Sequence, residues 1–190
     1  LAADGIPYHV ILHSTMDVAK SERRISLRQI QPALARAARL LVHGVADLNR
    51  LKSLQLDSAA AIVPHGTPRF HIDERANVRR SLGIAGKRVL ACFGYLLPDK
   101  GFGVLLDAFF RLRQRHPDLH LLLVTSLYPD PASEEEADRC RVRIAGDPHG
   151  ASVTTMTAHL EEVQVHAMLQ AADLLIFPYQ TTQESSSGAV

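Results

Sequence analysis

The sequence lacks long apolar runs, and none approaches the roughly 18 residues that a membrane-spanning helix needs. Internal repeats and low-complexity segments are absent as well. The formal net charge is only +1, which argues against nucleic acid as the main partner. The two cysteines, Cys92 and Cys140, are far apart and without metal-type spacing, and this usage is typical of a reducing, cytoplasmic compartment.

The chain has 190 residues, of which 46% are hydrophobic, so it can form one large or two small packed domains. It does not begin with Met, and a strand pattern follows almost at once. It stops at Gly188-Ala189-Val190, where the pattern of a helix begins. We therefore expect a fragment of a longer protein.

Apolar strand patterns and amphipathic helix patterns alternate along the chain, which predicts an α/β fold with parallel, doubly wound sheets. The irregular stretch 67–72 is interpreted as a crossing between two domains, 1–66 and 67–190. A polar loop is expected after Thr15, and Pro32 in the first turn or at a kink of the next helix. The expected strands are 8–12, 40–44, 59–63, 87–93, 119–124, 153–157 and 174–177, and the expected helices are 30–41, 45–54, 77–83, 102–116, 132–144 and 162–171.

The stretch Gly94–Gly101 lies between an apolar strand and a helix pattern that starts at Phe102. Such a loop belongs at the carboxyl edge of a parallel sheet, where ligands bind and helix N-termini attract anions. Because Lys100 adds a positive charge there, the loop is a candidate site for a phosphate-bearing ligand. The alternative is a solvated loop with one surface lysine.

Several motifs match a known family in order and spacing. In the first half these are a strand ending in Leu12-His13 and an Ile-Val-Pro-His-Gly crossing. After them come a Lys-Gly before a Leu-Leu-x-Ala-Phe helix, a Pro-x-Leu-x-Leu-x-Leu-Val-like strand and an Ala-Asp-x-x-x-x-Pro strand. The matching segments are Ile62–Gly66, Gly94–Leu96, Lys100–Gly101, Leu105–Phe109, Pro117–Val124 and Ala172–Pro178. Together they resemble the retaining GT-B glycosyltransferases of glycosyltransferase family 4. The resemblance implies two Rossmann-like domains that face a cleft, both incomplete in this chain.

The resemblance also implies functional residues, with His13, Lys100 and Glu184 as the catalytic candidates. Glu184 matches the first Glu of the family's Glu-x7-Glu motif, and the N–H groups of Ser187 to Ala189 would add a helix N-terminus for the diphosphate. The residues implied to bind the donor are Gly94, Tyr95, Lys100, Glu184, Ser187, Gly188 and Ala189.

Two departures from the family pattern are visible. Tyr95 replaces the arginine that usually joins the lysine on the diphosphate, and Thr125-Ser126 replaces a Gly-x-Gly. The second Glu of the motif would fall two positions after Val190. Structural roles stay open for His13 and Glu184, while His43 and His65 are interpreted as strand-end and hinge residues.

The sequence thus predicts a glycosyltransferase that moves a hexose from a nucleoside-diphosphate sugar to a sugar, lipid or polysaccharide acceptor with retention. We predict no cofactor, no metal ion and no nucleic-acid partner. Another GT-B enzyme, such as a sugar-nucleotide epimerase or a phosphorylase, is one alternative, and a catalytically silent nucleotide- or partner-binding relative is another. The predicted location is cytoplasmic. The arginines Arg23, Arg24 and Arg28 indicate a solvated face, with a peripheral contact to anionic lipids at the inner membrane face as the alternative.

Overall fold

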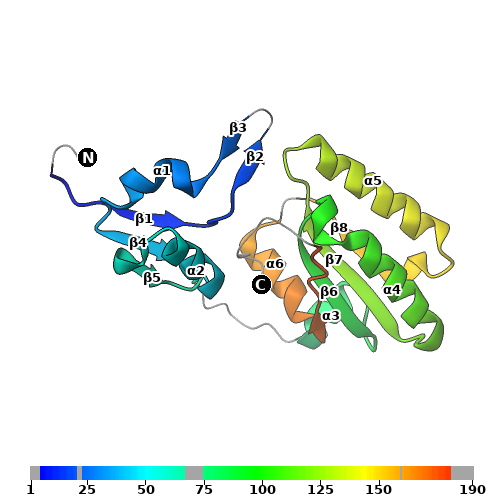
Figure 1. Cartoon of the computed structure of the whole chain (residues 1–190). Coiled ribbons are helices and arrows are strands. Elements are labelled where there is room, and N and C mark those ends of the chain that lie inside the picture. The colour runs from blue at the N-terminus through cyan, green and yellow to red at the C-terminus, as the bar shows by residue number, and fades with distance from the viewer. Residues whose placement is uncertain (1–4, 21–22, 67–74, 159, 181–190) are drawn as a thin grey trace. The chain divides into compact units, whose positions relative to one another are not determined.

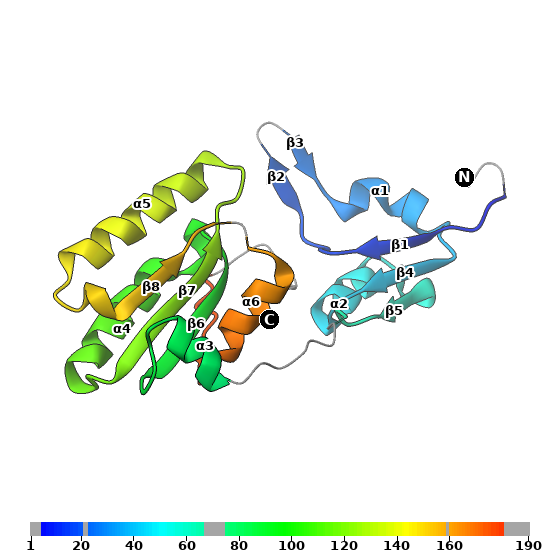
Figure 2. The ribbon, with the colours of Figure 1, turned by 180° about the vertical axis from the view of Figure 1, so that it is seen from behind.

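The computed structural model describes residues 5–20, 23–66, 75–158 and 160–180, with the backbone alone for 18–20 and 23–25 (Figures 1 and 2). These residues form two compact units, and the first contains the elements up to β5 whereas the second starts with α3. The predicted crossing at 67–72 lies outside the described residues.

The first unit is built on a parallel sheet with the strand order β1-β4-β5. Leu12 pairs with Val42, and Val42 pairs with Ile62, so the three strands end side by side. The three strands predicted before residue 66 are therefore confirmed. The elements are β1 (His9–Leu12), β2 (Val18–Lys20), β3 (Arg23–Ile25), α1 (Leu27–Leu34), β4 (Arg39–Val42), α2 (Val45–Ser53), η2 (Asp57–Ala59) and β5 (Ala60–Ile62).

One face of this sheet carries the core of the first unit. Leu40 and Val42 of the central strand are fully buried, and they share a cluster with Leu34 of α1 and Leu51 of α2. On the strands beside β4, Ile11 is 56% exposed and Ile62 is 38% exposed. The sheet is thus covered by helices on one face and carries exposed apolar side chains elsewhere.

Two expectations for the first unit were wrong. The polar loop after Thr15 contains an antiparallel pair of short strands, β2 and β3. The helix expected over 30–41 ends at Leu34, with Pro32 in its interior rather than in its first turn. The apolar spacing continues through Leu41, but Arg39–Val42 pair with the strands on both sides, and burial in the sheet outweighs the helical pattern.

The second unit has a four-stranded parallel sheet with the order β8-β7-β6-β9, which confirms the four strands predicted after the crossing. Figure 1 shows β6 and β7 in the middle of this sheet, with the helices packed around it. The elements are α3 (Arg75–Ser81), β6 (Arg88–Tyr95), η3 (Pro98–Lys100), α4 (Phe102–Arg115), β7 (Leu119–Ser126), α5 (Pro131–Gly146), η4 (Gly150–Ser152), β8 (Val153–Met156), α6 (Glu162–Gln170) and β9 (Leu174–Leu175).

Both faces of the second sheet are covered, as a parallel sheet requires. Leu121 and Leu123 of β7 pack in one cluster with side chains of α4 and α5, whereas Leu122 and Val124 pack in another with side chains of α6. Successive side chains of a strand point to opposite faces, so this alternation divides β7 between two cores. The predominantly apolar sequence of the strand follows from that double burial.

The loop before α4 lies against the segment that follows β9. Gly101 has the positive φ of 74°, and a Cβ at this position would overlap the carbonyl oxygen of Pro178. The backbone N–H of Gln180 donates a 2.8 Å hydrogen bond to the carbonyl oxygen of Asp99. Only glycine combines this backbone conformation with so close an approach of two backbones.

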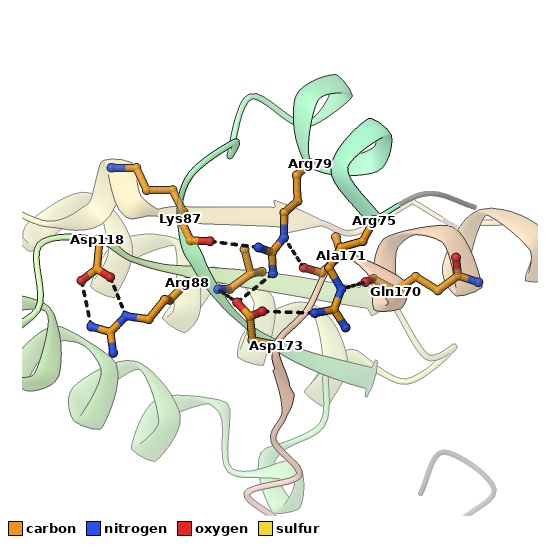
Figure 3. A network of polar contacts seen from close by, with 9 residues as sticks. Arg75, Arg79, Lys87, Arg88, Asp118, Gln170, Ala171 and Asp173 are labelled. Atoms are coloured by element: carbon orange, nitrogen blue, oxygen red, sulfur yellow. Dashed lines mark hydrogen bonds and ion pairs between the residues drawn. The ribbon is translucent and has the colours of Figure 1, made fainter. Parts of the chain in front are cut away.

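A polar network fixes the opposite, amino end of the sheet (Figure 3). Asp173 lies just before β9, and its Oδ2 accepts hydrogen bonds from the backbone N–H of Val89 at 2.8 Å and pairs with Arg79 of α3 at 2.7 Å. Arg75 pairs with Oδ1 at 3.3 Å. Burial acts to raise the pKa of Asp173, but the Val89 and Arg79 hydrogen bonds and the two positive charges outweigh it, and the pKa is lowered.

We expect Asp173→Ala to lower the free energy of unfolding by about 2 kcal/mol, because the change removes a charge-assisted hydrogen bond and leaves the Val89 N–H without its acceptor. The control is Asp118→Ala, since Asp118 forms an exposed ion pair with Arg88, and water screens such surface pairs so that they contribute little to stability. Urea unfolding measures both. Equal losses would show that Asp173 contributes no more than a surface ion pair.

The lowered pKa of Asp173 also determines how its contribution to stability changes with pH. A carboxyl group that titrates lower in the folded than in the unfolded chain stabilises the fold above its unfolded pKa, near 3.8, and this contribution disappears as the pH falls through the folded pKa. The stability difference between wild type and Asp173→Ala should therefore shrink when the unfolding series is repeated below pH 4.

Gly101→Ala should destabilise the fold by at least twice as much as Gly86→Ala. Both glycines have nearly the same positive φ, 74° and 75°, but a Cβ at Gly86 meets nothing within 4 Å. Backbone strain alone, about 1 kcal/mol, is thus common to both variants, and the collision with Pro178 is added at Gly101. Thermal unfolding of the two variants measures the difference, and equal shifts in Tm would contradict the close approach.

Candidate functional site

The candidate site of the second unit lies where β6 ends. The strand continues through Gly94 and Tyr95, which pair with Thr125 and Ser126 of β7, so the loop begins two residues later than predicted. After Leu96 the chain forms the short helix η3, and α4 starts directly behind it. This order brings Lys100 to the N-terminus of α4, which is the end of a helix that favours anions.

Lys100 is buried, with only 6% of its surface exposed. Its Nζ lies 4.2 Å from the centre of the Tyr179 ring, within the range of a cation–π interaction. Since a buried ammonium group needs compensation, the ring and the anchored segment at Gln180 help to hold the charge at this edge. The solvated surface lysine that was the alternative interpretation is therefore wrong for Lys100.

The structure brings part of the predicted donor site together. Gly94, Tyr95 and Lys100 all belong to the carboxyl end of β6 and the turn that follows it. The predicted positions in the C-terminal tail, which are Glu184, Ser187, Gly188 and Ala189, lie outside the described residues. His13 belongs to the first unit.

Tyr95, which occupies the position of the expected arginine, contacts a second tyrosine that the sequence analysis missed. The rings of Tyr95 and Tyr128 meet edge to face with centroids 5.2 Å apart, and both residues are more than 40% exposed. Tyr128 follows β7, the neighbour of β6, so strand adjacency explains the contact. The pair places exposed aromatic surface where the family pattern has a cation.

A hollow of about 310 Å³ lies between the first turn of α4 and the side of α5. Its basic side chains are neutralised by carboxylates. Arg143 donates two hydrogen bonds to Asp107, at 2.7 and 2.9 Å, and Arg139 donates one to Glu136 at 2.8 Å. This hollow is consequently a weaker candidate for a phosphate than the Lys100 turn.

The two cysteines are not candidates for a nucleophile. Burial raises the pKa of Cys92 to about 12, with a further contribution from the nearby Cys140. Burial likewise raises the pKa of Cys140 to about 11, with a contribution from Glu136. A thiol is nucleophilic as the thiolate, so both groups are inert at neutral pH.

In the first unit, the three strand ends bring three histidine rings together. His13 follows β1, His43 follows β4 and His65 lies shortly after β5. The ring centroids of His43 and His65 are 3.8 Å apart in a stacked arrangement, those of His13 and His43 are 5.0 Å apart, and His13 Nδ1 lies 3.2 Å from His43 Nε2. Sequence reasoning selected His13 alone as a functional candidate, although each predicted strand of this unit has a histidine at or near its end.

A buried carboxylate anchors the loop behind His13. Asp47, in the first turn of α2, is fully buried, and its Oδ1 accepts hydrogen bonds from the Thr15 hydroxyl at 2.6 Å and the Thr15 backbone N–H at 3.3 Å. Thr15 is itself only 1% exposed. The loop that follows His13 is therefore fixed to α2 by buried hydrogen bonds.

In the described part of the chain, no group of three or more His, Cys, Asp or Glu side chains has an arrangement that could hold a metal ion. The helices within the described ranges are all too short or too polar to cross a membrane.

No known protein-family profile matches the chain. The chain is 26% identical over 182 residues to the uncharacterized glycosyltransferase YqgM of Bacillus subtilis. This alignment covers 92% of the chain and 46% of YqgM. The chain is 30% identical over 129 residues to the lipopolysaccharide 1,2-N-acetylglucosaminetransferase of Salmonella typhimurium. This second alignment covers 66% of the chain and 34% of the Salmonella protein. The chain thus spans less than half the length of these curated relatives.

Among solved structures, Anabaena Alr3699/HepE in complex with UDP superimposes with a TM-score of 0.68. The match has 19% sequence identity and covers 91% of this chain and 47% of HepE. At this identity the likeness concerns the fold. The chain has the α/β fold of GT-B glycosyltransferases, with Rossmann-like units built on parallel sheets.

Proposed function

We propose that the protein is a glycosyltransferase that transfers a hexose from a nucleoside-diphosphate sugar to an acceptor, with retention and without a metal ion. The observation that carries the proposal is the similarity to a glycosyltransferase along 92% of the chain. The UDP in the HepE structure supports a nucleotide-sugar donor.

The chemistry requires a site that stabilises the negative charge of the departing nucleoside diphosphate. Lys100 supplies a positive charge at the end of β6, and the first turn of α4 supplies backbone N–H groups and the positive end of a helix dipole. Burial of Lys100 beside Tyr179 strengthens its field, because fewer water molecules screen it. Two fixed positive groups at one point can replace the charge that a metal ion would provide.

The remaining assignments follow from the family resemblance. Glu184 as a carboxylate acceptor suits the ribose hydroxyls or a hydrogen bond to the donor sugar. The N–H groups of Ser187, Gly188 and Ala189 would extend the anion site, and His13 would meet a sugar hydroxyl. The lipopolysaccharide transferase among the relatives favours a saccharide acceptor in polysaccharide or glycolipid synthesis. We place the protein in the cytoplasm, in keeping with its two buried, free cysteines.

A second candidate function is nucleotide binding without transfer. The observation that favours it is Tyr95, since its ring contacts Tyr128 and the site has one positive charge fewer than the family pattern provides. A measurement of sugar transfer distinguishes the glycosyltransferase from the protein that only binds a nucleotide.

The experiment is a thermal-shift screen of the full-length protein against UDP, GDP and ADP and their sugars, followed by a transfer assay with the stabilising donor. A glycosyltransferase gives a glycoside whose anomeric configuration, read by NMR, matches the donor. A new sugar nucleotide without acceptor indicates an epimerase, and a sugar phosphate formed from inorganic phosphate indicates a phosphorylase. Binding without any product supports the silent relative.

We expect Lys100→Ala to weaken nucleoside-diphosphate binding ten- to a hundredfold, as the loss of one charge-assisted hydrogen bond costs about 1.5–3 kcal/mol. The control is Tyr179→Leu, which removes the ring beside Nζ but keeps the charge. Calorimetric titration measures the affinities, and thermal unfolding shows whether each variant folds. If both variants lose stability equally and neither loses affinity, Lys100 has a structural role only.

A further inference from the structure

Three of the four tyrosines of the chain lie at the carboxyl edge of the second sheet. Tyr95 is the last residue of β6, Tyr128 follows β7 and Tyr179 follows β9. The ring of Tyr179 lies beside Lys100, whereas the rings of Tyr95 and Tyr128 contact each other. All of these residues belong to the second unit. The edge that carries the positive charge of Lys100 therefore also carries aromatic side chains.

The Tyr95 and Tyr128 rings have faces that the contact between them leaves uncovered. Their planes cross at 73°. In an edge-to-face pair the edge of one ring covers one face of the other, and the remaining faces are not used by the pair. Tyr95 is 46% exposed and Tyr128 is 43% exposed, and Leu127 beside them is 45% exposed. The two rings thus offer an aromatic surface to a flat, apolar partner.

Backbone hydrogen bonds fix the positions of both tyrosines. Tyr95 pairs with Ser126 in the ladder between β6 and β7. The N–H of Tyr128 donates a 2.9 Å hydrogen bond to the Oγ of Ser133, a fully buried residue in the first turn of α5. The carbonyl oxygen of Tyr128 accepts from the N–H of Asp130 at 2.7 Å. Because both residues are fixed in the unliganded protein, a ligand that stacks on them loses little affinity to the ordering of the chain.

The aromatic pair lies next to the Lys100 turn. The chain passes from Tyr95 through Leu96 directly into this turn, and the turn is bonded on its other side to the segment after β9. The strand order is β7-β6-β9, and neighbouring strands are about 4.8 Å apart, so the three strands span about 10 Å across the edge. A nucleoside diphosphate carries its charge at one end and a flat base at the other. The edge offers a matching cation and aromatic surface at a comparable separation.

The polar side chains closest to the pair are already engaged within the protein. The hydroxyl of Ser133 binds the Tyr128 N–H, and the hydroxyl of the buried Thr125 donates to the carbonyl oxygen of Met156 at 2.8 Å. A sugar is recognised through hydrogen bonds to its hydroxyl groups, whereas a base can be bound by stacking on its ring face. The surface of Tyr95 and Tyr128 consequently suits a base better than a hexose.

We propose that Tyr95 and Tyr128 form a stacking surface for the nucleobase of the nucleoside diphosphate whose phosphates bind at the Lys100 turn. The inference rests on the proposed function and adds the residues that contact the base. Every nucleobase has a π face, so stacking on tyrosine favours a nucleotide over a bare diphosphate without selecting one base. Tyr95 then replaces a contact to the phosphates by a contact to the base.

The test is calorimetric titration of the full-length protein with UDP, ADP, GDP and inorganic pyrophosphate, which has the charge of a diphosphate but no base. We expect Tyr128→Ala to weaken the binding of all three nucleotides about tenfold and to leave the affinity for pyrophosphate within about twofold of wild type. Tyr128→Phe keeps the ring and should bind the nucleotides within about threefold of wild type.

Two further variants separate stacking from general loss of apolar surface. Tyr95→Ala should show the same selective loss as Tyr128→Ala, since both rings belong to the surface. The matched control is Leu127→Ala, because Leu127 is equally exposed and adjacent in sequence but has no ring, and it should stay within about twofold of wild type. Thermal unfolding shows whether each variant folds. In the wild type, saturation of tyrosine ring protons should transfer to the base protons of UDP more strongly than to its ribose protons.

The outcomes distinguish this inference from the proposed function. A wild type that binds none of the nucleotides would overturn both. Nucleotide binding that is unchanged in the two alanine variants, or a loss that is equal for UDP and pyrophosphate, would overturn the stacking surface alone. A loss that appears with the sugar nucleotides but not with UDP would assign the tyrosines to the sugar and would likewise overturn the inference.

Discussion

Parallel strands cannot be joined by tight turns, and this constraint decides where the candidate site residues of the chain lie. Each strand must be followed by a crossover, so every strand ends at the same edge of its sheet and releases the chain into a loop there. In the second unit that loop contains Lys100 and leads into α4, and in the first unit the loops carry His13, His43 and His65. Within each unit, residues that are distant in sequence lie close together because the strands that carry them are neighbours.

The same constraint divides the electrostatics of the second sheet between its two edges. At the amino edge, Asp173 is satisfied by a backbone N–H and two arginines, and these bonds join α3 to the strand region. At the carboxyl edge, the positive charge of Lys100 is held by an aromatic ring.

The sequence allowed prediction of whatever depends on local patterns. The strand before Gly94 and the helix after Gly101 are both periodic, so the Lys100 turn was placed correctly. Contacts between segments that are distant in sequence were not predicted, such as Tyr179 beside Lys100 or Tyr128 against Tyr95.

The wrong predictions also concern contacts between segments that are distant in sequence. The apolar spacing over 30–41 is compatible with a helix, but α1 ends at Leu34. Arg39–Val42 pair with β1 and β5 instead, in the strand that was expected from residue 40. The pair β2 and β3 depends on antiparallel backbone pairing of three residues each, without an apolar run that reveals it. His43 and His65 were interpreted as strand-end and hinge residues, because their ring contact depends on the strand order β1-β4-β5, which no single motif contains.

The burial of both thiols has a practical consequence. Cys92 and Cys140 are the two cysteines of the chain, both are buried, and their raised pKa values keep them protonated at neutral pH. A thiol-reactive dye would therefore distinguish a new surface cysteine from the native ones by its thiolate fraction. The wild-type chain already has the chemical background that site-specific fluorescence labelling needs, and movements of a chosen loop on ligand binding can be followed without first replacing a native residue.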